Sequence, residues 1–85
     1  MLNIKKNIAI SESGFVFDPS TGESFSLNPV GLEIIQLIKS GKPYEEITQI
    51  MTGKYDVDAD TFERYFYDFV ATLKQFQLTE QHTND

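Results

Sequence analysis

Three carboxylates at alternate positions, Asp56, Asp58 and Asp60, form the cluster in this chain that most resembles a metal site. A calcium-binding loop opens with this spacing, but it also needs a glycine at its sixth position and a glutamate at its twelfth. Thr61 and Tyr67 occupy those two positions here. Because acidic residues are common at the start of helices, the segment instead predicts a helix N-terminus that is capped by Asp58.

No other grouping of side chains predicts catalysis. The single histidine, His82, has no nucleophile or carboxylate placed to form a relay with it. The absence of cysteine excludes disulfides, thiolate nucleophiles and cysteine-bound metals. Glu45 and Glu46 are adjacent, so a helix would direct them to different faces, and the glycines lack the spacing of a phosphate-binding loop. We therefore expect no catalytic residue, no metal, no cofactor and no enzymatic activity of the chain alone.

The composition predicts one small acidic domain. The chain has 85 residues, of which 40% are hydrophobic, and this is enough for a single core. Its formal net charge of −6 disfavours binding to nucleic acid or to an anionic membrane surface. Two lysines near the start are not followed by an apolar run, so we expect no signal peptide, no membrane span and a cytoplasmic protein.

Alternation of apolar and polar residues predicts three strands in the first third of the chain. The first is expected over Ile4–Ile10, the second around Phe15–Phe17 and the third over Glu23–Leu27. The segment Asp18-Pro19-Ser20-Thr21-Gly22 lies between the last two strands and contains the residues that favour a tight turn. These two strands are therefore expected to form a hairpin.

Residues that start and stop helices follow in order. Asn28-Pro29 predicts the cap and first turn of a helix that ends at Gly41. Pro43 opens a second helix that is expected to end at Gly53. A third helix of about 18 residues is expected to follow the Asp58 cap.

The predicted fold class is α+β, with a three-stranded antiparallel sheet followed by three helices. A single domain is expected over residues 1–78, with a disordered polar tail over residues 79–85. Because a helix follows the third strand at once, no further strand is available to pair with its far side. That strand is therefore expected to be an open edge of the sheet.

Natural proteins usually protect an open edge with lysine, proline or a bulge. Neither lysine nor proline occurs over Glu23–Leu27, and nothing there indicates a bulge. An unprotected edge favours the addition of a peptide as an extra strand. We therefore expect a peptide backbone to pair with the third strand.

The third helix carries a wide apolar stripe. The residues that recur at helical spacing are Phe62, Phe66, Phe69, Leu73 and Phe76. The first four are predicted to face the core, with Tyr65 and Val70 along the two margins of the stripe. A small sheet and two short helices are not expected to cover the whole stripe. The uncovered part would form an apolar groove beside the third strand. The sequence does not determine which margin lines it.

The chain carries Phe25-Ser26-Leu27-Asn28 leading into a helix and Tyr55-Asp56-Val57 before a long last helix. In these two motifs it resembles the PqqD family, which includes the peptide chaperone of pyrroloquinoline quinone synthesis and recognition domains for ribosomally made, post-translationally modified peptides. The resemblance covers nearly the whole chain, roughly from Ile4 to Leu78. It is extended by Gly31, Ile34-Ile35, Leu37-Ile38, Gly41, Ile47, Phe69-Val70, Leu73 and Leu78.

The resemblance implies a winged-helix-like fold in which the leader peptide of a precursor adds as a strand beside the third strand, against the third helix. It further implies which residues bind the peptide: Ser24, Phe25, Ser26 and Leu27 on the strand, and Tyr65, Phe66, Phe69, Val70 and Leu73 on the helix. It also implies that the loaded protein presents the peptide to a maturation enzyme, such as a radical S-adenosylmethionine enzyme, a protease or a cyclase. Two positions depart from the family pattern. Gln77 stands where many relatives have glycine, and Tyr65 stands where many have an acid, so the helix end and the leader specificity do not carry over.

Two other functions are compatible with this architecture. The chain could be a docking or regulatory subunit that binds a segment of a partner protein, and the sequence does not separate this from leader binding. It could also be a winged-helix transcription regulator, which needs a basic recognition helix. The third helix carries Arg64 and Lys74 against three acids, which disfavours that function.

Overall fold

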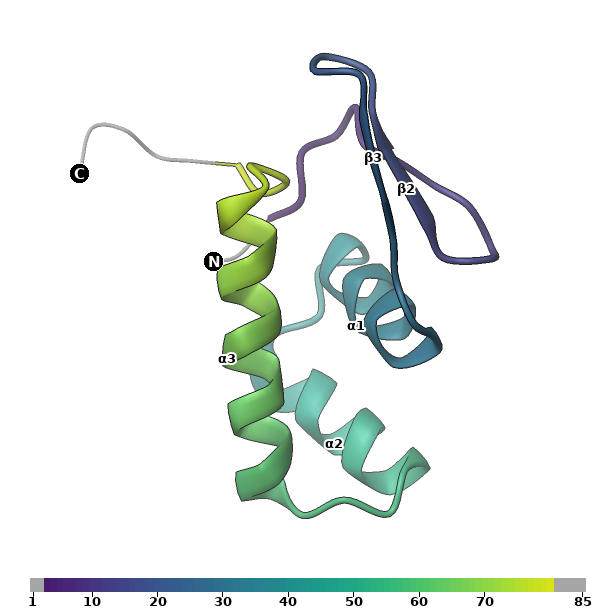
Figure 1. The fold of residues 1–85 in the computed structure, drawn as a ribbon. Coiled ribbons are helices and arrows are strands. Elements are labelled where there is room, and N and C mark those ends of the chain that lie inside the picture. The colour runs from purple at the N-terminus through teal and green to yellow at the C-terminus, as the bar shows by residue number, and fades with distance from the viewer. Residues whose placement is uncertain (1–2, 81–85) are drawn as a thin grey trace, which may run out of the picture.

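The computed structural model describes residues 3–80, which begin with three strands paired antiparallel in the order β1-β2-β3. The strands are β1 (Ala9–Ile10), β2 (Phe15–Asp18) and β3 (Glu23–Ser26). Three helices follow the sheet (Figure 1), which confirms the predicted α+β fold class.

The first strand is shorter than predicted. Only two residues pair with β2, whereas Ile4 forms an isolated antiparallel bridge with Thr79. A turn separates Ile4 from β1, and it is closed by a hydrogen bond from the Ile8 N–H to the Lys5 carbonyl (3.3 Å). The prediction of one continuous strand over residues 4–10 was therefore wrong, although Ile4 and Ile8 are both buried in the core.

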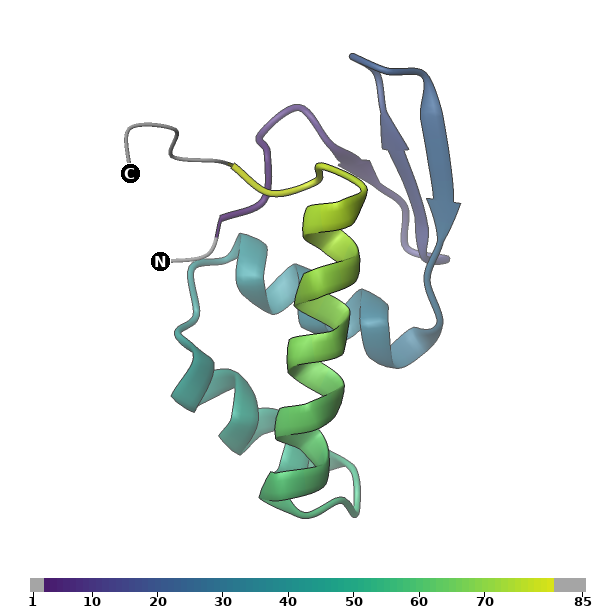
Figure 2. The same ribbon diagram turned by 60° about the vertical axis from the view of Figure 1, so that its left-hand side comes forward.

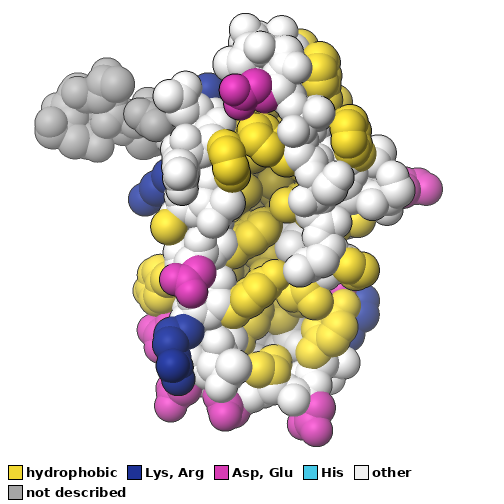
Figure 3. Space-filling view, in the orientation of Figure 1, with side chains coloured by type: hydrophobic (Ala, Val, Ile, Leu, Met, Phe, Trp, Pro, Cys, Tyr) yellow, Lys and Arg dark blue, Asp and Glu magenta, His cyan; other side chains and the backbone are white. Residues whose placement is uncertain are grey.

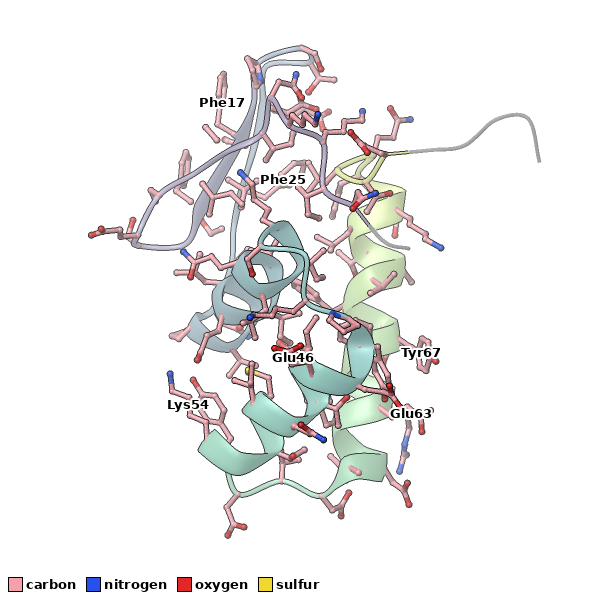
Figure 4. All side chains as sticks on the ribbon, turned by 180° about the vertical axis from the view of Figure 1, so that it is seen from behind. Phe17, Phe25, Glu46, Lys54, Glu63 and Tyr67 are labelled. Atoms are coloured by element: carbon pink, nitrogen blue, oxygen red, sulfur yellow. The ribbon has the colours of Figure 1, made fainter. Side chains whose placement is uncertain are left out.

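The two faces of the sheet carry different side chains. Val16 is fully buried toward the helices, and Phe25 lies opposite it on β3. Phe15 and Phe17 point to the outer face, where they are 49% and 41% exposed. Figure 4 shows Phe17 and Phe25 on opposite sides of the sheet. The smaller β2 side chain thus enters the core, and the two aromatic ones stay outside.

The β2–β3 turn is held by Asp18, which is itself buried. Its Oδ1 accepts hydrogen bonds from the Ser20 hydroxyl (2.6 Å) and the Ser20 N–H (3.0 Å). These bonds hold the pKa of the Asp18 carboxyl below its usual value. Gly22 closes the turn at a φ of +79°, a conformation that glycine adopts without steric cost. The predicted hairpin is confirmed.

Helix α1 (Pro29–Lys39) begins at the predicted cap. The Asn28 Oδ1 accepts a hydrogen bond from the Gly31 N–H (2.7 Å), and proline occupies the first helical position, where its missing N–H costs nothing. The helix buries Gly31, Ile34, Ile35 and Ile38. Gly41 follows its end at a φ of +86°, as expected for a helix stop.

Helices α2 (Tyr44–Lys54) and α3 (Ala59–Gln75) complete the fold. Helix α2 continues through Gly53, so the prediction that this glycine ends the helix was wrong. Helix α3 begins after the predicted cap, because the Asp58 Oδ1 accepts a hydrogen bond from the Thr61 N–H (2.7 Å). This bond is the main reason that the pKa of Asp58 is lowered.

The end of α3 uses an unusual residue. Gln77 has a φ of +60°, the left-handed conformation that glycine usually supplies after a helix. The Leu78 N–H then donates a hydrogen bond back to the Leu73 carbonyl (2.9 Å). The helix therefore ends with the backbone that glycine would give, although the residue is glutamine.

Helix α3 runs past all the other elements. The sheet lies near its C-terminal end, α2 near its N-terminal end and α1 between them (Figures 1 and 2). The core lies between these layers and consists of Ile4, Ile8, Val16, Ile34, Ile35, Ile38, Ile47, Met51, Phe62, Phe66, Leu73 and Leu78.

The two ends of the described chain are joined to each other. The Lys5 N–H donates to the Leu78 carbonyl and the Glu80 N–H donates to the Asn3 carbonyl, both at 2.9 Å. Thr79 between them is 1% exposed. The predicted tail therefore does not begin at Thr79, and its remaining residues, 81–85 with His82, lie outside the described part of the chain.

Candidate functional site

Among residues 3–80, strand β3 has a neighbour on one side only, because it pairs with β2 and lies at the end of the sheet. The Leu27 N–H donates to the Gly14 carbonyl on the β2 side (2.7 Å). Backbone groups alternate in direction along an antiparallel strand, so Phe25 also bonds toward β2, whereas Ser24 and Ser26 direct their N–H and C=O groups away from it. These two serines provide two donors and two acceptors for another strand.

The described ends of the chain, near residues 3 and 80, do not pair with this edge. Ile4 is the N-terminal residue that bridges to another segment, and its partner is Thr79 rather than β3. Within residues 3–80, no strand pairs with the far side of β3. The condition that strand addition requires is therefore met in the described part of the chain.

Beside the open edge lies an apolar groove, which we call the β3–α3 groove and define by Ser24–Asn28 on one wall and by Tyr65, Phe69 and Phe76 on the other. Figure 3 shows a hollow with a hydrophobic floor between α3 and the segment that leads from β3 into α1. Phe25 and Leu27 are half-buried on the inner face, where they pack against the core.

Three contacts fix the width of the groove. At one end the rings of Phe25 and Phe76 are tilted against each other, with centroids 4.4 Å apart. In the middle Phe69 packs against Gly31, and a Cβ atom on this glycine would lie 3.1 Å from the Phe69 ring. At the other end the Tyr65 hydroxyl donates a long hydrogen bond to the Asn28 cap (3.5 Å).

The groove continues into a pocket of about 290 Å³ at the start of α1. Its lining is mostly apolar and comes from all three helices and their connections: Asn28, Val30, Met51, Tyr55, Val57, Thr61, Phe62 and Tyr65. Asn28 and Tyr65 belong to both the groove and the pocket. An extended chain that pairs with β3 could therefore place an apolar side chain in this pocket.

A polar cluster supports the outer wall of the pocket. The Glu33 carboxylate accepts hydrogen bonds from the Lys54 ammonium (2.5 Å) and from the Tyr55 hydroxyl (2.6 Å). These bonds, first from Lys54 and then from Tyr55, lower the pKa of Glu33, and the same contacts raise the pKa values of Lys54 and Tyr55. The cluster joins α1 to the end of α2 and so holds the Tyr55 ring in the pocket wall.

The predicted groove residues do not all lie in one place. Tyr65 is 37% exposed and Phe69 is half-buried, and both lie on the β3 side of α3. Phe66 and Leu73 are buried in the core, so they support the groove from beneath. Val70 lies on the other margin of α3, in a hollow that faces away from β3.

Sequence reasoning missed two residues of the groove. Phe76 was placed in the helical stripe, but its position opposite Phe25 follows from where the sheet crosses the end of α3. Asn28 was identified only as a helix cap, although it also contacts Tyr65. Its position between the predicted open edge and the predicted start of a helix could have indicated that Asn28 lies in the groove.

The described residues contain no arrangement for metal chemistry. Among residues 3–80, no three His, Cys, Asp or Glu side chains are placed to hold a metal ion. Asp58 serves as a helix cap, as the sequence predicted. No helix in the same range is both long and apolar enough to cross a membrane.

Two solved structures resemble this chain over nearly its whole length. One is a complex of TbiB1 with the TbiA(beta) leader peptide, which is 31% identical and covers 95% of this chain and 98% of that one, with a TM-score of 0.84. The other is a lasso peptide synthetase B1 complexed with the leader peptide, at 23% identity and a TM-score of 0.83, which supports the shared fold. Among curated proteins, none has a significantly similar sequence.

The family comparison agrees with the resemblance seen in the sequence. Residues 14–78 match the family described as coenzyme PQQ synthesis protein D (PqqD). The matched range contains β2, β3, all three helices and both walls of the β3–α3 groove. This chain belongs to the PqqD family.

Proposed function

We propose that this chain binds the leader segment of a ribosomally made precursor peptide as an added strand along β3 and presents it to a maturation enzyme. The observation that carries the proposal is the open edge at Ser24 and Ser26 beside the apolar β3–α3 groove. Two similar structures hold leader peptides, which supports the same class of ligand here.

The geometry gives the bound peptide a definite arrangement. Ser24 and Ser26 can exchange four backbone hydrogen bonds with the peptide, which fixes its register. Because side chains alternate along a strand, every second peptide residue faces α3 and contacts the inner side chains Phe25 and Leu27. Affinity then comes from the backbone pairing, and specificity comes from the apolar side chains that enter the groove.

In this proposal the chain itself does no chemistry, and the reaction belongs to its enzyme partner, a radical S-adenosylmethionine enzyme, a protease or a cyclase. The binding surface consists of backbone groups and apolar or aromatic side chains, which select a peptide without activating a bond in it. A role as a subunit that docks a segment of a partner protein would use the same groove. Peptide titration separates the two, because only leader binding follows the precursor sequence.

The test is a titration of the ¹⁵N-labelled protein with synthetic peptides that cover short reading frames next to its gene, and with the TbiA(beta) leader peptide as a reference. We expect a dissociation constant in the micromolar range or tighter for the cognate peptide. Amide shifts should concentrate in residues 23–28 and on the Tyr65–Phe69–Phe76 side of α3. If the cognate peptide binds and the amide chemical shifts of β3 do not change, strand addition is refuted.

A paired variant tests the groove wall. Replacement of Tyr65 by alanine removes a partly exposed ring and should weaken peptide binding while leaving the fold intact. Replacement of Leu73, which is 1% exposed, should instead unfold or destabilise the protein by about 2–5 kcal/mol. Equal peptide affinity for wild type and Tyr65→Ala would exclude this part of α3 from the site.

A further inference from the structure

Helix α3 carries a second stripe that the β3–α3 groove does not use. Glu63, Tyr67, Val70 and Lys74 are spaced by four, three and four residues, so they lie along one face of the helix. Tyr67 is 58% exposed, Val70 is half-buried, and the two charged ends are exposed. Figure 4 shows Glu63 and Tyr67 projecting from the same side of α3.

This stripe borders an apolar hollow of about 410 Å³ between α3 and the start of α2. The hollow lies on the margin of α3 away from β3, and its lining is Ile38, Pro43, Tyr44, Ile47, Phe66, Tyr67, Val70 and Lys74. The ring of Tyr44 stacks on Tyr67, with centroids 6.0 Å apart and planes inclined by 22°. The face therefore presents aromatic and aliphatic surface to solvent in a shape that can receive a neighbouring helix.

The charges on this face would be complementary between two copies of the chain. Glu63 lies at one end and Lys74 at the other, and within residues 3–80 neither forms an ion pair. The midpoint of Glu63 and Lys74 along the helix coincides with the midpoint of Tyr67 and Val70. A two-fold axis through that point places each Glu63 beside the Lys74 of the other copy, and each Tyr67 beside the other Val70.

We propose that α3 pairs antiparallel with α3 of a second copy along Glu63, Tyr67, Val70 and Lys74, forming a two-fold dimer. The β3–α3 groove lies on the opposite margin of α3, so both copies can hold a peptide at once. The contact consists of one helix face and the start of α2, so we expect it to bury less than the roughly 1,200–2,000 Å² found in stable complexes. The dimer is therefore weak and depends on protein concentration.

The test is sedimentation equilibrium from 10 µM to 1 mM for wild type, E63K, K74E and the double variant E63K/K74E. Each single reversal places like charges together twice in the dimer and should weaken association by about tenfold or more. The double variant restores opposite charges and should return to within about threefold of wild type. E12K changes the net charge as E63K does, but it lies in the exposed loop between β1 and β2 and should associate as wild type does.

The outcomes decide between the possible occupants of this face. A wild type that stays monomeric at 1 mM would overturn the proposal, and the stripe would then belong to a different partner. A double variant that remains as weak as the single ones would also overturn it, because the predicted charge pairs would not exist. Peptide titrations of the same variants give an independent control, since the dimer and the β3–α3 groove use opposite margins of α3.

Discussion

Replacing Ser24 with proline tests whether the open edge of β3 receives another strand. The Ser24 N–H points away from β2, so its loss removes no hydrogen bond from the sheet. Proline is tolerated on an edge strand when its missing N–H faces outward, and the preceding Glu23 is already in a strand. The variant should therefore fold while lacking one donor for the peptide.

The size of the effect follows from that missing donor. One carbonyl of the bound peptide would be placed against the strand without a partner, and an unsatisfied group of this kind costs about 1–3 kcal/mol. A loss of about 1–3 kcal/mol corresponds to a weakening of roughly 5- to 150-fold in the dissociation constant. The proline ring adds bulk at the same edge, so the effect should lie toward the upper part of this range.

The assay is isothermal titration calorimetry with the cognate leader peptide, accompanied by thermal melting to confirm the fold. Ser24→Val is the matched control, because it keeps the N–H and places its side chain on the outer face beside Phe17. It should bind within about threefold of wild type. A folded Ser24→Pro protein that binds as tightly as the valine variant would refute the pairing with β3.

Three further predictions concern stability. Gly14→Ala should destabilise the protein by about 2 kcal/mol or more, because the new Cβ would lie 2.6 Å from the Leu27 carbonyl oxygen and the backbone has a φ of +94°. Gly22→Ala should cost only about 1–2 kcal/mol, because Gly22 has a φ of +79° but open space around it. Equal melting temperatures for the two variants would contradict this difference. Gln77→Gly should stabilise the fold by about 1 kcal/mol, or roughly 4–8 °C in melting temperature, because glycine adopts the left-handed conformation without steric cost. An unchanged or lower melting temperature would show that the glutamine is not strained. Glu33→Gln should remove part of the pH dependence of stability. Because folding lowers the pKa of Glu33, its carboxylate stabilises the fold at pH values above its ordinary pKa of 4.5, and this stabilisation is lost as the pH falls through the lower folded-state pKa. The free energies of unfolding at pH 7 and pH 3 should therefore differ less in the glutamine variant than in the wild type, by about 1 kcal/mol or less. An identical difference in both proteins would show that the Glu33–Lys54 ion pair does not contribute to stability.

Much of the fold could be predicted because its boundaries are set by local chemistry. Asn28, Pro29 and Asp58 start helices through hydrogen bonds and backbone angles that lie within a few residues. The hairpin likewise follows from Asp18 and Gly22 in its turn. Such signals do not depend on how distant segments pack, so they can be recognised without a structure.

The failures occurred where distant segments decide the outcome. Ile4 leaves the first strand because its partner, Thr79, lies at the other end of the sequence. Val70 has the right spacing for the groove, but the position of the sheet determines which margin of α3 lines it. Gly53 stays helical because a lone glycine weakens a helix without always ending it.

The pairing of Asn3–Lys5 with Leu78–Glu80 brings the two ends of the domain together, apart from the open edge of β3. A short connection between these ends would leave β3 and its groove unchanged. A circular permutant reopened in the exposed loop between β1 and β2 should therefore remain foldable. For the same reason, the domain could be inserted as a unit into a surface loop of an enzyme, where both junctions would enter at one point.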